Sequence, residues 1–158
     1  NPNYENYGAL YNHPAASDVC PEGWHLPTWG EWEDLINYVD DEFDGGIQLR
    51  SCRAVNSSLG GDCNTTNHPR WDESTLLQDL VQGTDDFGFS ALPSGWIVYE
   101  ENAWGTEHKP GSEAIFWTLS FDTPLSYSKV FRLDLDNLGY EIQTFRENNG
   151  FSVRCVKD

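Results

Sequence analysis

The pattern of apolar and polar positions predicts short strands through the second half of the chain. Residues 115–121 form a strongly apolar run, and residues 130–135 and 139–145 alternate on either side of a hairpin-like turn at 136–139. Apolar side chains alternate again in 151–156, the pattern of a strand with one buried face. We therefore expect several short antiparallel strands, the last of them at the end of the chain.

The pattern is less regular in the middle of the chain. Alternation in 87–91, continued in 96–100, predicts a further hairpin, followed by a loop over 101–113. Residues 47–54 fit either a short helix or a strand, and 56–75 are dominated by Asn, Ser, Gly, Thr and Asp, which is typical of loop.

One early stretch has helical spacing. The apolar residues of 29–39 recur every three or four positions, and Thr28 with Glu31 three residues later forms a capping box. A short strand is expected before it, at 7–11. One early helix, a long irregular middle and several short antiparallel strands predict an α+β domain with long loops.

The size and composition fit one domain that spans residues 1–158. A domain of this size buries enough surface to fold without disulfides. Aromatic residues make up 14% of the chain, so they supply much of the expected core volume. No apolar run approaches the length needed to span a membrane.

The charge excludes two classes of partner. Nine Lys and Arg stand against 26 Asp and Glu, which gives a formal net charge of -17. Nucleic acids and anionic lipid surfaces are both recognised through cationic side chains, so neither is an expected partner. The acidic residues either keep the chain soluble or bind divalent cations.

Two acidic stretches could bind calcium. The segment DDEFDGG carries Asp40, Asp41 and Asp44, and the segment DLDN carries Asp134 and Asp136. Neither matches the calcium loop that closes with a Glu. The sequence therefore predicts no cofactor, with calcium as the alternative left open.

The four cysteines predict two disulfides. They are Cys20, Cys52, Cys63 and Cys155; no two form a CxxC pair, and none lies near a cluster of basic residues. An even number of such cysteines indicates an oxidising compartment. Three connectivities are possible. Cys52 and Cys63 bracket a short flexible stretch and favour each other, which leaves Cys20 to tether the last strand through Cys155.

No enzymatic signature is present. The chain lacks the nucleophile-elbow, zinc-protease and phosphate-loop motifs, and its histidines are scattered. We therefore expect no catalytic residues, and His25 is expected to be a structural hydrogen-bonding residue. The sequons at Asn56 and Asn64 either carry glycans in a secreted chain or arise by chance in an Asn-rich loop.

Sugar binding without a metal would use exposed aromatic rings beside polar groups. Trp104, with Glu107 and His108, lies in a polar loop of this character, and Trp96 and Trp29 are further candidates. The alternative is that these rings fill gaps in a loop-rich fold.

Five segments carry a resemblance to a known family. They are YGALYNHPAA, CPEGWHLPTWGEWEDL, TDDFGFSALPSGW, AIFWTLS and NNGFSVRCVKD, in this order along the chain. Together they resemble the Fibrobacter succinogenes major paralogous domain family. The resemblance implies a bacterial secreted or surface-anchored protein with a fold related to the C-type lectin-like group. It also implies a disulfide between an early cysteine and one in the last strand, which matches Cys20 and Cys155.

The sequence departs from the family pattern in three ways. The segment that usually precedes the YGALY-like stretch is missing, the pair Cys52 and Cys63 does not resemble a family-wide feature, and the charge is unusually negative. A missing strand would leave an open sheet edge, which invites self-association.

We expect a non-catalytic, extracellular bacterial surface module that serves adhesion, surface architecture or ligand display. The alternatives are a structural subunit of an extracellular filament and a carbohydrate-binding module that uses loop aromatics.

Overall fold

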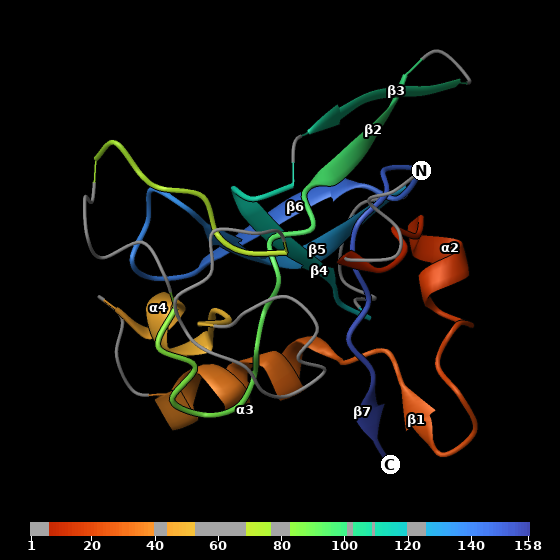
Figure 1. Ribbon diagram of the computed structural model, residues 1–158. Helices are drawn as coiled ribbons and strands as arrows, with labels where there is room; N and C mark the ends of the chain where they lie inside the picture. Colours follow the sequence, from red (N-terminus) through yellow and green to blue (C-terminus); the bar gives the residue numbers. More distant parts are fainter. Residues whose placement is uncertain are drawn as a thin grey trace.

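The computed structural model describes residues 7–39, 44–52, 69–76, 83–100, 103–108, 110–119 and 126–158, and only the backbone of 100 and 103–108. This part of the chain has the predicted α+β composition of few helices and short antiparallel strands (Figure 1). None of its helices has the length and apolarity needed to cross a bilayer. In order, the elements are α2 (His13–Ala16), β1 (Trp24–His25), α3 (Trp29–Val39), α4 (Gly45–Leu49), β2 (Trp96–Glu100), β3 (Ala103–His108), β4 (Glu113–Trp117), β5 (Tyr127–Asp134), β6 (Glu141–Arg146) and β7 (Val156–Lys157).

The strands form three small antiparallel sheets. The central one has the order β4-β5-β6, and the ribbons β2-β3 and β1-β7 have two strands each. Phe131 of β5 lies opposite Phe116 of β4 on one side and Ile142 of β6 on the other. The chain end also covers the outer edge of β4, because Ser152 donates to the Ile115 carbonyl (2.9 Å) and accepts from the Trp117 amide (3.1 Å).

The helix α3 has the bounds that the sequence predicts, and its capping box is formed. The Thr28 hydroxyl accepts from the Glu31 amide (3.3 Å), and the Glu31 carboxylate accepts from the Thr28 amide (2.8 Å). Both orphan donors at the helix start are therefore satisfied by side chains.

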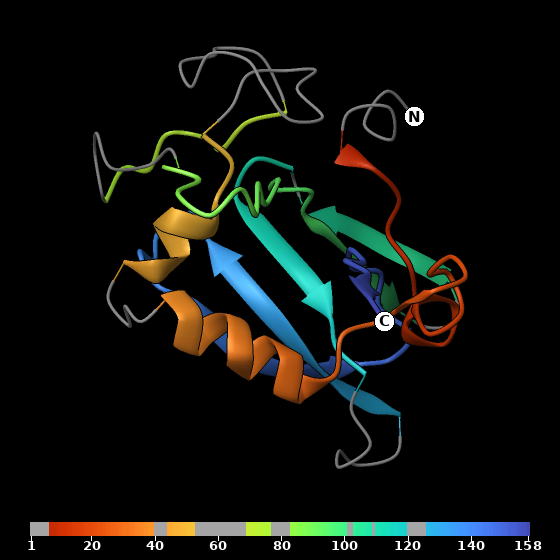
Figure 2. The ribbon, with the colours of Figure 1, turned by 90° about the horizontal axis from the view of Figure 1, so that it is seen from below.

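One face of α3 packs on the central sheet, across which the helix lies (Figure 2). Trp32 is 2% exposed and stacks on Phe131 of β5 with ring centroids 4.5 Å apart. Phe116 of β4 lies against the same indole. This aromatic cluster fixes the distance between the helix and the sheet.

The opposite face of the sheet carries a second core cluster. Trp117 of β4 is fully buried against Phe151, with centroids 4.6 Å apart, and its indole N–H donates to the Tyr11 carbonyl (2.7 Å). Ala16 of α2 and Leu26 complete this side. The early segment before α3 therefore covers the face that α3 leaves free.

A disulfide joins Cys20 to Cys155, as the sequence predicts, with Cα atoms 5.8 Å apart and a sequence separation of 135 positions. It lies near the β1-β7 ribbon, in which His25 pairs with Val156. Cys52 is also disulfide-bonded. Its predicted partner Cys63 lies outside the described residues.

Three local predictions are wrong. Residues 103–108, expected to be loop, form β3, which pairs with β2. Residues 7–11 make one bridge, between Tyr11 and Phe151, rather than a strand. Residues 87–91 make a single bridge at Ala91, and Phe87 is 40% exposed beside Tyr38 of α3. In each case pairing with another segment, which local alternation does not report, decided the backbone conformation.

Candidate functional site

A groove runs between α3 and β6 and has a volume of about 810 Å³. The helix contributes Trp29, Glu33, Ile36 and Asn37, which follow the i, i+4, i+7, i+8 spacing of one helix face. Tyr140, just before β6, and Ile142 of β6 form the opposite wall, and the remaining lining residues are Thr28, Gly30, Glu31 and Asp34. The groove therefore combines aromatic and aliphatic surface with carboxylates and an amide.

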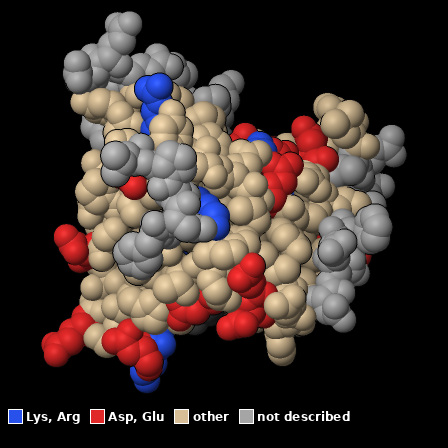
Figure 3. All heavy atoms as spheres, turned by 180° about the vertical axis from the view of Figure 1, so that it is seen from behind, with Lys and Arg blue, Asp and Glu red and all other residues tan. Residues whose placement is uncertain are grey.

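The lining of this groove is acidic. Glu33 and Asp34 are exposed, Glu31 lies at the helix start, and no Lys or Arg is among the lining residues. The nearest cation contact belongs to Lys129 of β5, whose ammonium lies 5.3 Å from the centroid of the Trp29 ring. The face in Figure 3 likewise shows more acidic than basic side chains. The groove is thus suited to a ligand with positive charge.

The candidate sugar-binding residues lie in two places. Trp29 borders the groove, where Lys129 occupies one side of its ring. Trp96 lies on β2 and packs against Phe145 and Phe151, with centroids 5.7 and 5.9 Å away, so its ring belongs to the second core cluster. The prediction that these rings bind sugar stays a prediction.

The ribbon β2-β3 brings the remaining candidates together in the backbone. His108 is the register partner of Trp96, Glu107 that of Ile97, and Trp104 that of Tyr99. The side chains of these β3 residues lie outside the described part of the structure.

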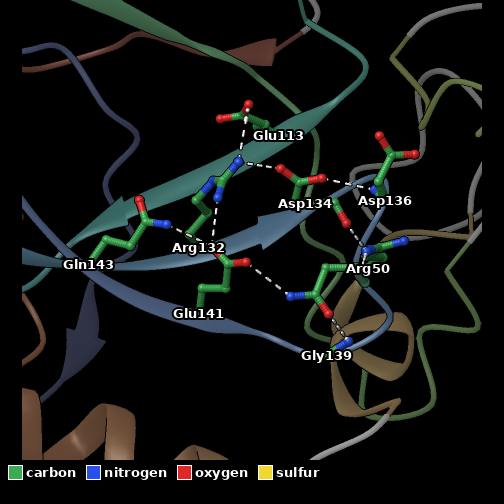
Figure 4. A network of polar contacts seen from close by, with 9 residues as sticks. Arg50, Glu113, Arg132, Asp134, Asp136, Gly139, Glu141 and Gln143 are labelled. Carbon is green, nitrogen blue, oxygen red and sulfur yellow. Dashed lines mark hydrogen bonds and ion pairs between the residues drawn. The ribbon is translucent and has the colours of Figure 1, made fainter.

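One of the predicted calcium ligands, Asp134, takes part in a polar network around Arg132 (Figure 4). The Arg132 guanidinium pairs with Asp134, with Glu141 (2.6 Å) and with Glu113 (3.3 Å). Burial alone would lower the pKa of Arg132, but the three carboxylates outweigh it and raise that pKa. The Asp134 carboxylate is therefore engaged by a cation of the protein itself.

The other acidic candidates are separated from this network or engaged locally. The Asp136 carboxylate accepts from the Ser74 hydroxyl (2.6 Å), and that of Asp44 accepts from Gln48 (3.2 Å). Asp40, Asp41, Asn56 and Asn64 lie outside the described residues. Within the described ranges, no group of three or more His, Cys, Asp or Glu could hold a metal ion.

His25 links the start of α3 to residue Asp158, in keeping with the structural role predicted for it. Its Nδ1 lies 2.6 Å from the Asp158 carboxylate, and its Nε2 lies 2.8 Å from that of Glu31. The bonds to Asp158 and Glu31 raise the pKa of His25. Burial opposes ionisation of Glu31, but hydrogen bonds from Thr28 and His25 outweigh it and lower that pKa.

We expect this link to make stability depend on pH. Because the folded-state pKa of His25 is raised, its contribution is complete below about 6.5, the unfolded value, and is lost as the pH rises through the folded value. The Glu31 contribution is lost at the acidic end, as the pH falls through its lowered pKa. Melting temperatures across the neutral range should therefore fall with rising pH more steeply in the wild type than in H25Q.

The variant D158N serves as a control, because it removes the negative charge that contributes most to the raised pKa of His25. The fall in melting temperature should then occur at lower pH than in the wild type. Identical pH profiles for the wild type and H25Q would contradict the assignment.

The residues of the groove could be found only in part from the sequence. The helical spacing of Trp29, Glu33 and Ile36 marks a second face of α3 beside the one that carries Trp32, and this was a usable signal. Tyr140 and Ile142 belong to a strand about a hundred residues away in sequence, so their position next to α3 follows only from the sheet order.

The chain was compared with known proteins. The model of the family described as the Fibrobacter succinogenes major domain matches residues 1–157. No curated protein and no solved structure matched. The match covers nearly the whole chain, which includes α3, β4 and the disulfide-bonded Cys155. The chain belongs to the Fibrobacter succinogenes major domain family.

Proposed function

We propose that the chain is a non-catalytic, extracellular bacterial surface module for adhesion or ligand display, and that the groove between α3 and β6 is its ligand site. The proposal rests on the groove, because the groove places apolar rings beside exposed carboxylates. Its walls, α3 and the segment that leads into β6, both pack against the core. A rigid, partly apolar depression with a few polar groups is the usual form of a binding site.

The chemistry of the groove supports binding without turnover. No His, Cys or Ser is among its lining residues. The Thr28 hydroxyl at its edge donates to the Glu31 carboxylate (2.8 Å) within the capping box. A catalytic hydroxyl would instead need an adjacent general base to accept its proton during attack, and the carboxylate here is already engaged by the helix start and by His25.

An extracellular location is supported by the disulfide between Cys20 and Cys155, since such bonds persist in oxidising compartments. A C-type lectin-like fold is the finer form of this proposal. It is supported by the covalent tie between an early segment and the last strand, and by the pairing of β1 with β7.

The proposal predicts a binding partner that is released unchanged. The immobilised chain is to be tested against arrays of glycans and of extracellular proteins, with E33K as the groove variant. Glu22 is exposed and is not a lining residue, so E22K makes the same charge change elsewhere. We expect E33K to weaken binding about ten-fold and E22K to leave it unchanged.

The mass of the bound molecule then decides between binding and catalysis. A ligand recovered with an altered mass would show turnover and overturn the non-catalytic part of the proposal. If E33K binds the ligand as well as the wild type does, the binding site lies outside the groove. The aromatic residues of the β2-β3 ribbon would then be the alternative site.

A further inference from the structure

We propose, on the basis of the proposed function, that the groove between α3 and β6 binds an extended polypeptide segment with basic side chains, which adds to the central sheet as a strand next to β6. The inference concerns the class of ligand at this site. It depends on three features: the uncovered sheet edge at β6, the outward direction of backbone N–H and C=O groups on β6, and the acidic lining of the groove.

The two edges of the central sheet differ. The chain end covers β4 through the hydrogen bonds of Ser152. β6 is the other outer strand, and within the described residues no strand pairs with its free side. An uncovered edge strand presents unpaired N–H and C=O groups, to which an extended segment can add.

The register shows which backbone groups face outward. The amide of Glu147 donates to the Ser126 carbonyl (2.9 Å), one residue beyond the end of the ladder in which Arg146 lies opposite Tyr127. Hydrogen-bonded and non-hydrogen-bonded pairs alternate along an antiparallel ladder. The N–H and C=O groups of Ile142 and Thr144 therefore point away from β5, toward the free side of the sheet.

The groove begins at this edge. Ile142 is 36% exposed and lines the groove opposite Trp29 and Ile36 of α3. A strand added to β6 would place every second side chain toward α3, because successive side chains of a strand point to opposite faces. Those side chains would meet the apolar groove residues and the carboxylates at its rim.

Charge selects the occupant. The exposed Glu33 and Asp34 lie among lining residues that include no Lys or Arg. A segment with Lys or Arg beside small apolar residues complements this lining. A second copy of the chain is disfavoured, because each copy carries a formal charge of -17 and like charges repel.

The test uses a short peptide of alternating valine and lysine as the probe. A control peptide of equal charge carries N-methyl groups on alternate amides, which removes the donors needed to pair with an edge strand. Binding is measured by calorimetry at high salt, and the site is mapped through the amide NMR signals of the full chain. We expect the probe to shift the Ile142 and Thr144 amides and the methylated peptide to bind about ten-fold more weakly.

Two proline variants test the edge. T144P removes an N–H that points outward, so we expect it to fold and to lose about ten-fold in affinity for the probe. Q143P removes an N–H that faces β5 and should destabilise the sheet, as a check on the register. Thermal melts are to check that T144P is folded. We expect E33K to lower the affinity for the probe peptide as T144P does, although it leaves the backbone donors in place.

Each other outcome overturns the inference. Equal binding of the two peptides would mean attraction by charge alone. No shift at β6 with saturating probe would exclude strand addition. An oligosaccharide that shifts the groove amides while the peptides do not would refute a peptide ligand yet retain the proposed function. Concentration-dependent shifts at β6 without peptide would identify a second copy as the occupant.

Discussion

Replacing both Cys20 and Cys155 by serine is expected to lower the free energy of unfolding by about 5 kcal/mol. The bond joins residues 135 positions apart. In the chain-entropy account, closing so long a loop removes about that much conformational freedom from the unfolded state. For a domain of this size the melting temperature should fall by roughly 10–20 °C.

The loss should begin at the end of the chain. β1 and β7 are two residues long each, and Asp158 is held by a hydrogen bond from its backbone N–H to the Gly23 carbonyl (3.0 Å) and by His25. Strands this short are not stable alone. Without the disulfide, we expect hydrogen exchange of the β7 amides to increase before the global transition, whereas those of β5 stay protected.

The pair C52S/C63S is the matched control. If Cys52 pairs with Cys63, the closed loop is short, and the expected loss is about 3 kcal/mol in the same entropic account. Equal losses in the two double variants would show that loop length does not govern the effect. A melting temperature of C20S/C155S within about 2 °C of the wild type would contradict the tether itself.

The parts of the fold that could be predicted from sequence have local causes. The bounds of α3 follow from the Thr28–Glu31 capping box and the helical spacing of Trp32 and Leu35, all within one segment. β5 and β6 follow from alternation on either side of one turn. The pairing of Cys20 with Cys155 followed from the spacing of only four cysteines together with the family resemblance.

The parts that could not be predicted depend on pairing and packing partners rather than on local alternation. β3 shows little alternation of its own and exists because β2 pairs with it. Trp24 lies in one of the segments that resemble the family, yet it is 44% exposed, because its two-residue strand lies at the surface against β7. The candidate groove joins α3 to β6, so its wall of Tyr140 and Ile142 could be placed only once the sheet order was known.

Replacing Arg50, a residue that no sequence motif marks, is expected to cause the second large loss in the free energy of unfolding. Its side chain is fully buried, and its Nη2 donates to the carbonyls of Asp134 and Asn137 at the turn that leads to β6 (Figure 4). The guanidinium lies 4.6 Å from the centroid of the Trp71 ring, which is itself anchored by a bond from its indole N–H to the Ala91 carbonyl (3.1 Å).

Burial removes the charge of Arg50 from water, which is unfavourable for the charged form. Burial lowers the pKa of Arg50 to about 10, against the opposing influence of Asp134 and Asp136. Desolvation of the cation therefore exceeds its attraction to the two carboxylates. We therefore expect the stabilising contribution to come from the hydrogen bonds to the two carbonyls and from packing on Trp71.

R50A should therefore lower the free energy of unfolding by about 3–5 kcal/mol, because it leaves a cavity beside Trp71 and removes the guanidinium donor from two partly buried carbonyls. R50M keeps the volume and loses only the donors, so its expected loss is smaller, about 1–3 kcal/mol. Arg146 is exposed on β6, and R146A should change the value by no more than about 0.5 kcal/mol. Denaturant titrations of the three variants measure these differences.

The order of the variants separates the two contributions of Arg50. A loss in R50M equal to that in R50A would assign the whole effect to the hydrogen bonds at the turn before β6, and packing on Trp71 would then contribute nothing. If R50M is as stable as the wild type, the hydrogen bonds to the two carbonyls contribute no net stability, and the Arg50 side chain stabilises the fold only by filling space. An R50A loss below about 1 kcal/mol would contradict the burial of this side chain, because a fully enclosed group of this size cannot be removed without leaving either a cavity or unsatisfied carbonyls.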